Sequence, residues 1–269
     1  MMKVDYVIPT YNSAYCLDKC LVAVKKYGNP HNIFIIDKFS EDETLKIAQA
    51  HHCKIIQTNA TLGKCRIIGA QKAETDWIAF VDSDIIINKD WQKMFNYCDN
   101  KSIGAIQIKS EEKNPDRPYF LSPNPFSSRF TRGFTGATLI RRNLVLDAPI
   151  EDCQAFEDWF LSKHIIKKGY QWLVTLISPE DHLHIAEHDK SGEAVIWHSQ
   201  SWFRYYKNKK ISLFTFLVFF LRHTIGFLIK GKFKLAYYFL IGPFKPEYFA
   251  MKRKPLKKKE ENTNNEYSS

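Results

Sequence analysis

The first 110 residues alternate short runs of apolar, strand-type residues with segments whose apolar residues recur at helical spacing. Strands are expected over Lys3–Ile8, Asn32–Asp37, Lys54–Gln57, Trp77–Val81 and Ile103–Ile108. Helices are expected between the first four strands, over Ala14–Lys26, Asp42–Ala50 and Lys64–Ala73. Because strands joined by such helices form right-handed crossovers, the alternation predicts an α/β fold with a mostly parallel central sheet and flanking helices.

The remaining sequence is less regular. Residues 111–132 are rich in Pro, Ser and Arg and are expected to form a long loop. A strand over Phe134–Arg141 and a helix over Ala155–Lys168 follow. We therefore expect one domain over 1–200 with halves 1–110 and 111–200, amphipathic helices over 201–250, and a polar, disordered tail over 251–269.

Composition excludes several classes of protein. Apolar residues make up 45% of the 269 residues, which is too many for a disordered chain. The six cysteines are scattered without a Cys-x-x-Cys pair, which excludes a disulfide scaffold or zinc ribbon and suits a reducing compartment. Asp5 stands where a secretory signal would have its apolar core, so no signal peptide is expected.

The positive charge is concentrated at one end of the chain. Residues 203–269 hold 15 of the 39 basic residues and 4 of the 29 acidic ones, a net charge of +11. The preceding 202 residues hold 24 basic and 25 acidic residues and are nearly neutral. This partition argues against nucleic-acid binding by the body and predicts that the terminal segment meets an anionic surface.

The segment FVDSD at 80–84 is the strongest sign of chemistry. Its two carboxylates, Asp82 and Asp84, follow a buried-type strand and repel each other unless a partner neutralises them. A divalent cation such as Mg²⁺ or Mn²⁺ would do so, because hard cations prefer oxygen ligands. The alternative is an ordinary polar turn after a strand.

Three further segments precede FVDSD: VIPTYN at 7–12, IIDKFSEDET at 35–44 and GKCRIIGA at 63–70. In this order the four segments resemble glycosyltransferase family 2, and the resemblance covers about residues 1–200. It implies the GT-A fold, a nucleotide-binding half over 1–110 and an acceptor-binding half over 111–200. It also implies a nucleotide-diphospho-sugar donor and a Mn²⁺ or Mg²⁺ cofactor.

The resemblance assigns roles to residues at the strand ends. Residues implied to bind the nucleotide are Pro9, Thr10, Tyr11, Asp37, Lys64, Arg66 and Asp82. Asp82 is implied to contact the ribose or a metal-bound water, and Asp84 to be a direct metal ligand. The sequence itself supports an anion near Lys64 and Arg66, because cations in the first turn of a helix need a compensating partner. A solvated basic helix face is the alternative.

One departure from the family concerns the base. Many members have two adjacent acids after the second strand, whereas this chain has Asp37 and Lys38. The second acid often contacts the base, so a uridine and a guanosine donor both stay open.

Two later segments resemble the sugar and acceptor side of the family. FTGATLIRR at 134–142 resembles the strand beside the donor sugar, where Gly136 and Ala137 would let the sugar approach the backbone. An ordinary strand with one glycine is the alternative.

FEDWF at 156–160 resembles the family's Glu-Asp motif. The resemblance makes Asp158 the general base on the acceptor hydroxyl and places Glu157 and Trp159 beside the acceptor and sugar. A carboxylate suits that task because the nucleophile needs a proton acceptor within hydrogen-bond reach. Acidic residues also favour the first turn of any helix, which is the alternative.

Four histidines follow this segment: His182, His184, His188 and His198. The family often supplies a further metal ligand near this distance, and His184 fits best, although His182 would share its strand face. Zinc is an alternative, but the spacing is not that of a known zinc finger.

The apolar stretch Ile211–Ile229 is interrupted by Arg222 and His223 and is flanked by basic residues on both sides. A central arginine costs about 2.5–3.5 kcal/mol on insertion scales, and a crossing would put one cationic flank on the wrong side. In-plane or shallowly re-entrant helices are therefore expected here, and Leu235–Phe244 is expected to form a second such helix. Six aromatic residues are expected at headgroup level: Trp197, Trp202, Tyr205, Tyr206, Tyr237 and Tyr238. A helical hairpin packed on the catalytic domain or on a sister subunit, and a transmembrane helix, are the alternatives.

Together these observations predict a peripheral or monotopic enzyme on the cytoplasmic face of a membrane. It would move a hexose, with inversion, from a nucleotide-diphospho-sugar to a lipid-linked acceptor, either a polyprenyl phosphate or a lipid-linked saccharide. The expected partners are that donor, that acceptor and anionic lipids; no nucleic acid is expected, and a homo-oligomer is left open. The alternatives are a non-catalytic nucleotide-sugar-binding membrane protein and a nucleotidyltransferase, although the latter lacks its Gly-rich phosphate loop.

Overall fold

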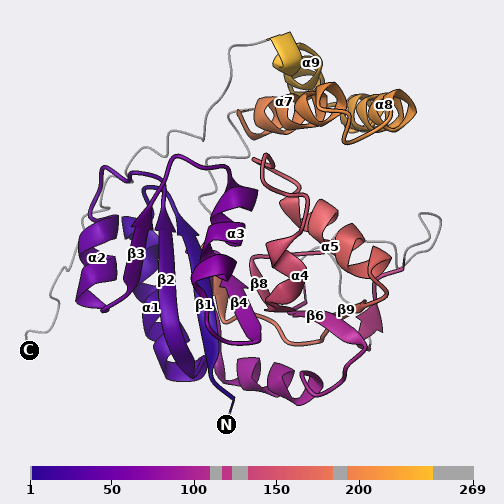
Figure 1. Ribbon diagram of the computed structural model, residues 1–269. Coiled ribbons are helices and arrows are strands. Elements are labelled where there is room, and N and C mark those ends of the chain that lie inside the picture. Colours follow the sequence, from indigo (N-terminus) through magenta and orange to yellow (C-terminus); the bar gives the residue numbers. More distant parts are fainter. Residues whose placement is uncertain (1, 110–116, 123–132, 184–192, 245–269) are drawn as a thin grey trace, which may run out of the picture.

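The computed structural model describes residues 2–109, 117–122, 133–183 and 193–244. Its main sheet has eight strands in the order β3-β2-β1-β4-β8-β6-β9-β7, and helices flank it (Figure 1). The strands of this sheet are β1 (Val4–Thr10), β2 (Pro30–Asp37), β3 (Lys54–Gln57), β4 (Trp77–Val81), β6 (Ile103–Gln107), β7 (Tyr119–Phe120), β8 (Ala137–Arg141) and β9 (Gln171–Val174). Two further strands, β5 (Ile85–Ile86) and β10 (Asp181–His182), pair with each other. All pairings among β1 to β4 are parallel, so the predicted α/β fold with a mostly parallel sheet is confirmed.

The three helices expected in the first half are present as α1 (Ala14–Tyr27), α2 (Thr44–Ala50) and α3 (Leu62–Lys72). The 3-10 helix η1 (Lys89–Tyr97), which follows β5, was not expected. The main difference from expectation is at Pro9, which was expected to end the first strand but lies inside β1 and pairs with Ile36. The pairing of β1 with β4 ends at Val7 and Phe80, so the missing N–H of Pro9 interrupts no hydrogen bond to β4.

The second half mixes strand directions. Strand β8 lies antiparallel between β4 and β6, and it begins at Ala137 rather than at Phe134. Of the expected loop over 111–132, residues 117–122 are described, and Tyr119 and Phe120 form β7 at the sheet edge instead of continuing the loop. The helices here are α4 (Asn143–Leu146) and α5 (Glu157–Lys167).

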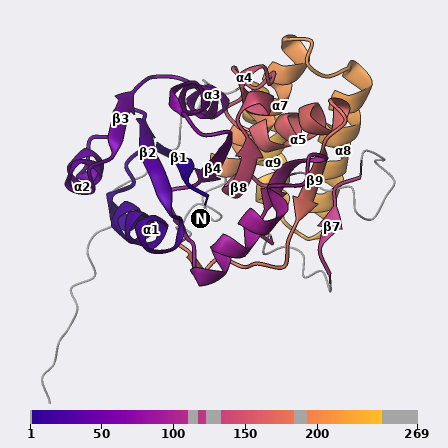
Figure 2. The same ribbon diagram turned by 60° about the horizontal axis from the view of Figure 1, so that its bottom comes forward.

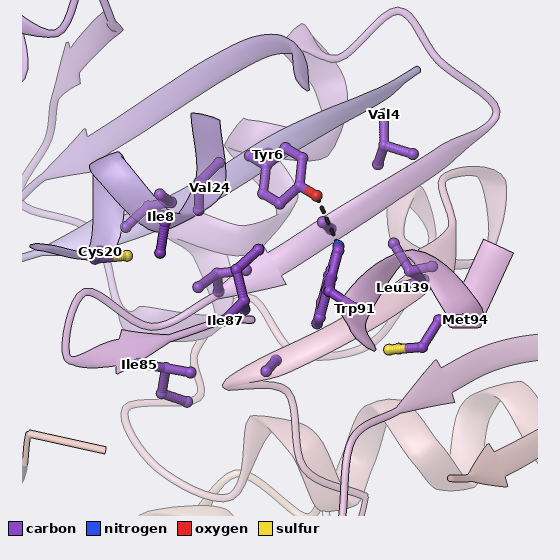
Figure 3. Close-up of a cluster of buried hydrophobic side chains, with 14 of the residues drawn as sticks. Val4, Tyr6, Ile8, Cys20, Val24, Ile85, Ile87, Trp91, Met94 and Leu139 are labelled. Atoms are coloured by element: carbon purple, nitrogen blue, oxygen red, sulfur yellow. Dashed lines mark hydrogen bonds between the residues drawn. The ribbon is translucent and has the colours of Figure 1, made fainter. Parts of the chain in front are cut away.

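The core lies on both faces of the sheet because successive residues of a strand point to opposite faces. Val4, Tyr6 and Ile8 of β1 pack with α1 and η1 on one face, whereas Val7 packs with α3 on the other. Figure 3 shows the first cluster, where the Trp91 indole N–H donates to the Tyr6 hydroxyl at 2.7 Å. The Tyr6 hydroxyl donates in turn to the carbonyl of Gly28 at 2.8 Å, and burial raises the pKa of Tyr6.

Asp5 joins three segments at the amino end of the sheet. Its fully buried carboxylate accepts hydrogen bonds from the backbone N–H groups of Asn32, Glu74 and Thr75, and from the Asn32 side chain. Burial alone would raise the pKa of Asp5, but these hydrogen bonds outweigh it and lower the pKa. The carboxylate therefore links β1 to the start of β2 and to the turn before β4.

We expect Asp5→Ala to lower the free energy of unfolding by about 2–4 kcal/mol, because three backbone N–H groups lose the buried carboxylate that accepts from them. A group whose pKa is lowered on folding stabilises the fold above its ordinary pKa, and this stabilisation disappears as the pH falls through the lowered value. Urea unfolding between pH 7 and pH 2 should therefore show a weaker pH dependence in Asp5→Asn than in the wild type. An unchanged pH profile would contradict this role.

Three helices at the C-terminal side pack together beyond the carboxyl ends of the parallel strands (Figures 1 and 2). They are α7 (Glu193–Lys207), α8 (Leu213–Ile229) and α9 (Phe233–Ile241), followed by the short 3-10 helix η2 (Gly242–Phe244). Helix α7 runs through the boundary expected between residues 200 and 201, so it belongs to both predicted segments. The expected tail over 251–269 lies outside the described residues.

The aromatic residues of α7 differ from expectation. Trp202 and Tyr205, which were expected at a membrane interface, are 3% and 0% exposed. Trp202 packs against Phe219 of α8 at 3.9 Å between ring centroids, and Tyr205 packs edge-on against Phe160 at 5.0 Å. The headgroup prediction is therefore wrong for these two residues, because their rings join α7 to its neighbours in the protein.

Helix α8 has no buried residue. Among the residues that the structure describes, no helix combines the length and the apolar character that crossing a bilayer requires.

Candidate active site

A cavity of about 170 Å³ opens where the parallel strands end. Its lining includes the last residues of β1, the residues after β2 and β4, the start of α3, and one residue of α7. The lining residues are Pro9, Thr10, Tyr11, Ser13, Ile36, Lys38, Ala60, Leu62, Cys65, Ser83, Gln154 and Trp197. Such cavities beyond the carboxyl ends of strands are the usual ligand sites of open α/β sheets. The predicted nucleotide residues Pro9, Thr10 and Tyr11 all line it.

Asp37 lies at the end of β2 and is fully buried. Its carboxylate accepts hydrogen bonds from the Thr10 hydroxyl at 2.9 Å, from the backbone N–H and hydroxyl of Ser40 at 2.9 and 2.5 Å, and from the Gln57 amide at 3.3 Å. Asp37 is not among the residues that line the cavity. Its contacts fix the end of β1 and the loop after β2, and direct contact with a nucleotide stays a prediction.

Lys38 takes the place beside the cavity that an acid often holds in the family. It lines the cavity together with Cys65 of α3. Burial lowers the pKa of Lys38, and the neighbouring Cys65 opposes this effect. Burial also raises the pKa of the Cys65 thiol to about 11. The cavity therefore has a cationic group on its β2 side.

Arg66 is the centre of a buried ion network. It is 1% exposed, and its Nη2 donates to Asp82 Oδ1 at 3.0 Å and to Glu157 Oε1 at 3.3 Å. Its Nε donates to the same Glu157 oxygen at 3.3 Å, which also accepts from the Thr135 hydroxyl at 3.1 Å. Burial alone would lower the pKa of Arg66, but the carboxylates of Asp82 and Glu157 raise it.

This network gives Arg66 a structural role. Its side chain joins an acid after β4 to an acid at the start of α5, and the nucleotide contact expected of it stays a prediction. Its Nη1 is buried and has no hydrogen-bond partner among the described residues. The guanidinium lies over the ring of Phe80 at 5.0 Å, so the network is packed on the apolar face of β4. Arg66 therefore connects the two halves of the domain.

Asp82 is held from two sides. Its backbone N–H donates to the carbonyl of Gly136 at 2.7 Å, and its side chain is 37% exposed although Oδ1 pairs with Arg66. A methyl group on Gly136 would lie 2.8 Å from Asp82 Oδ2 and 2.5 Å from the Phe134 ring. Gly136 therefore leaves room for the carboxylate, and its contact with a donor sugar, like that of Ala137, stays a prediction.

Asp84 faces a histidine. The side chain of Asp84 is 16% exposed, and His182 Nε2 lies 3.8 Å from its Oδ1. Strand β10 brings this histidine there, because His182 pairs with Ile85 of β5 and Leu183 N–H donates to the Asp84 carbonyl at 2.8 Å. His184, the predicted metal ligand, lies outside the described residues. Among those that are described, no group of three or more His, Cys, Asp or Glu side chains is arranged to hold a metal ion.

The Glu-Asp motif opens α5. Glu157 and Asp158 are 5% and 6% exposed, and Asp158 Oδ1 accepts from the backbone N–H of Trp159 at 2.7 Å. The preceding Phe156 has a positive φ of 59°, which is costly for a bulky residue and persists only where packing enforces it. Its ring contacts His198, Trp202 and Phe219. These aromatic residues therefore fix the backbone directly before the two acids.

Two further predicted residues lie at the edge of this region. Lys64 pairs with Glu151 at 3.1 Å, and its side chain is 37% exposed. Trp159 contacts Phe160 and Trp202, and the Lys163 ammonium lies 3.9 Å from its ring centroid. Neither residue is among those that line the cavity.

Sequence reasoning missed Ser83, Gln154 and Trp197 as residues of the cavity. Ser83 lies between the two predicted acids, and its hydroxyl donates to the Ser13 hydroxyl at 3.0 Å, so its position in the motif was a usable signal. No neighbouring motif in the sequence marks Gln154 or Trp197 as a cavity residue, because only the packing of α5 and α7 brings these two residues to the end of β1.

Comparisons with known proteins agree with this geometry. The model of the family "Glycosyl transferase family 2" matches residues 5–156. A curated relative, the poly(ribitol-phosphate) beta-N-acetylglucosaminyltransferase TarS of Staphylococcus aureus, is 34% identical over 103 residues, which are 35% of this chain and 18% of TarS. The chain thus matches less than a fifth of the length of that relative.

Solved structures show the same fold. The S. aureus TarS 1-349 structure has a TM-score of 0.55 at 21% identity and covers 75% of this chain and 65% of its own. Glucosyl-3-phosphoglycerate synthase from Mycobacterium tuberculosis, solved in complex with Mg²⁺ and uridine diphosphate, has a TM-score of 0.57 at 13% identity and covers 71% of this chain and 74% of its own.

Proposed function

This chain belongs to glycosyl transferase family 2, and we propose that it moves a hexose from a uridine-diphospho-sugar to a lipid-linked acceptor at a membrane surface. As a family member it is a glycosyltransferase. The uridine donor is proposed because TarS 1-349 and glucosyl-3-phosphoglycerate synthase have both been solved with uridine diphosphate.

The observation that best supports transfer is the Arg66 network. It joins Asp82, on the side where the nucleotide is expected, to Glu157, on the side where the acceptor is expected. A transferase must hold both substrates within bonding distance, and a rigid, buried link between the two sides favours that geometry. Asp158 follows Glu157 directly and would be within reach of an acceptor hydroxyl.

The side chains near Asp84 fit a divalent cation. A carboxylate and an imidazole face each other at 3.8 Å in a half-buried position, and both are ligands of Mn²⁺. Two protein donors suffice where phosphate oxygens and waters complete the shell, as is usual for Mg²⁺. Asp84 and His182 would hold the cation, and Asp82 lies beside it. Such a cation neutralises the charge that develops on a departing diphosphate.

Asp158 would act as the general base. Its carboxylate would accept the proton of the acceptor hydroxyl while the hydroxyl attacks the anomeric carbon and the diphosphate leaves from the opposite face, which inverts the configuration. A polyprenyl phosphate acceptor would already be ionised and would need no base. Asp158 would then only align that acceptor.

We expect Asp158→Asn to lower kcat by about 10²–10⁴-fold with a hydroxyl acceptor, since this is the usual contribution of a general base. Asparagine keeps an oxygen for the Trp159 N–H, so stability and uridine diphosphate binding should not change. The measurement is acceptor-dependent release of uridine diphosphate with a lipid-linked saccharide and with a polyprenyl phosphate. A loss confined to the saccharide identifies a hydroxyl nucleophile, and full activity with both acceptors would refute the role of Asp158.

The membrane part of the proposal relies on α8 and α9. Large apolar side chains are exposed along both helices, with Phe214 at 76% and Ile229 at 81%. The complete set is Leu213, Phe214, Leu217, Val218, Leu221, Ile225, Leu228, Ile229, Phe233, Tyr237 and Leu240. Exposed lysines lie at both ends of α8, at positions 207, 209, 230, 232 and 234. An apolar face bordered by cations complements an anionic lipid surface, which attracts each basic residue by about 1 kcal/mol.

We expect the double variant Phe214→Glu/Ile225→Glu to bind anionic vesicles at least about tenfold more weakly, since each buried apolar side chain contributes about 1.5–3 kcal/mol. The measurement is co-sedimentation with phosphatidylcholine/phosphatidylglycerol vesicles at low and high salt. Val22→Glu, on the exposed side of α1, is the matched control. Equal binding by the double variant would show that α8 is not the docking face.

A further inference from the structure

One wall of the candidate nucleotide cavity comes from the C-terminal helices. Trp197 of α7 is half-buried and lines the cavity with Pro9, Thr10 and Tyr11 from the end of β1. Almost two hundred residues separate these segments in the chain. Figure 1 shows α7 beyond the carboxyl ends of the parallel strands.

Helix α7 is held firmly in that place. The hydroxyl of Tyr205 accepts from the backbone N–H of Ala155 at 3.3 Å, and the ring of Trp202 lies 5.5 Å from that of Phe156. On the other side of α7, the Gln200 amide donates to the carbonyl of Gly242 at 3.1 Å. The indole of Trp197 is therefore carried on a helix that is anchored both to the start of α5 and to the end of α9.

The cavity has the chemistry that a nucleobase requires. Two aromatic side chains, Tyr11 and Trp197, supply flat apolar surface, and Lys38 supplies a cationic donor. A base stacks on such rings whatever its hydrogen-bonding pattern, and a lysine ammonium can donate to a keto oxygen but cannot accept from an amino group. The cavity therefore favours a base with a keto oxygen, such as uracil.

We propose that Trp197 is a donor-binding residue whose indole stacks against the nucleobase of the bound nucleoside diphosphate. This inference rests on the proposed function, because it names how the same site holds its donor. It assigns to α7 a direct part in substrate binding, in addition to its packing role. The base would then be held between strand-end residues of the N-terminal half and a ring from the C-terminal helices.

The test is isothermal titration of the full chain with uridine diphosphate and Mn²⁺. Trp197→Ala should weaken binding by about tenfold, which corresponds to the stacking of one base. Trp197→Phe keeps an aromatic ring and should bind within about threefold of the wild type. Tyr97→Ala, which changes an exposed ring on η1, is the control and should bind like the wild type.

Inorganic pyrophosphate with Mn²⁺ separates stacking from a structural effect, because it has no base. The wild type and Trp197→Ala should bind pyrophosphate equally. Equal affinity of both proteins for uridine diphosphate would overturn the inference, and so would an equal loss of uridine diphosphate and pyrophosphate binding. A wild-type protein that binds no nucleoside diphosphate would instead refute the proposed function itself, and this inference with it.

Discussion

Replacing Asp84 with alanine is expected to lower sugar transfer by at least about 10³-fold, because the variant loses the carboxylate proposed to hold the cation at the leaving diphosphate. Asp84 follows β4 by a few residues, and its side chain faces His182 at 3.8 Å. Removing one of two neighbouring carboxylates also relieves repulsion with Asp82, so thermal stability without ligand should stay equal or rise.

The measurement combines turnover with ligand-linked stabilisation. Mn²⁺ with uridine diphosphate should raise the Tm of the wild type and should leave that of Asp84→Ala nearly unchanged. Asp76→Ala is the matched control, because Asp76 is exposed and directly precedes the other end of the same strand. Turnover like that of the wild type, or an unchanged response to Mn²⁺, would refute the metal-binding role of Asp84.

Arg66→Met is expected to lower the free energy of unfolding by about 3–5 kcal/mol, the usual effect of removing one partner of a buried ion pair. Methionine fills most of the volume, so the loss comes from the carboxylate of Glu157, which is 5% exposed and would lose its cation. Asp82 is 37% exposed on its side chain and can be solvated, so it contributes less. Transfer activity should fall as well, because the link between the two sides of the site is lost.

A double-mutant cycle separates the ion pair from simple packing. Arg66→Met combined with Glu157→Gln should recover part of the lost stability, because the uncompensated charge is gone. Arg66→Lys is a second control. A single ammonium group cannot reproduce the donors that Arg66 directs at Asp82 and Glu157 from Nε and Nη2. Arg66→Lys should therefore be more stable than Arg66→Met and less stable than the wild type. Urea unfolding of the four proteins of the cycle and of Arg66→Lys checks this, and strictly additive effects of Arg66→Met and Glu157→Gln would contradict a direct coupling.

The sequence could predict those parts of the site that depend on residues adjacent in the chain, and not those that depend on contacts between distant residues. Asp82 and Asp84 could be placed at a strand end because a run of buried apolar residues and the polar residues after it are adjacent in the chain. The same holds for Pro9, Thr10 and Tyr11. Ends of parallel strands meet at one sheet edge, so the chain order alone brings these residues together.

The directions of long side chains were not predictable in this way. Arg66 was expected to bind a nucleotide, which stays a prediction, and its contact with Glu157, which is 91 positions away in the chain, could not be foreseen. Trp202 and Tyr205 were expected at a lipid surface, and they pack on Phe219 and Phe160. An amphipathic aromatic residue suits an interface and a protein core equally well, so composition could not distinguish the two environments.

The sequence by itself determined the α/β class, the parallel half of the sheet and the positions of the acids, because periodicity and strand order are local properties of the chain. Tertiary structure alone decided that Arg66 joins the two sides of the site and that Trp197 of α7 lines the cavity. Both depend on which elements pack against each other, and that choice is made by the burial of apolar surface across the whole molecule rather than by any neighbouring residue.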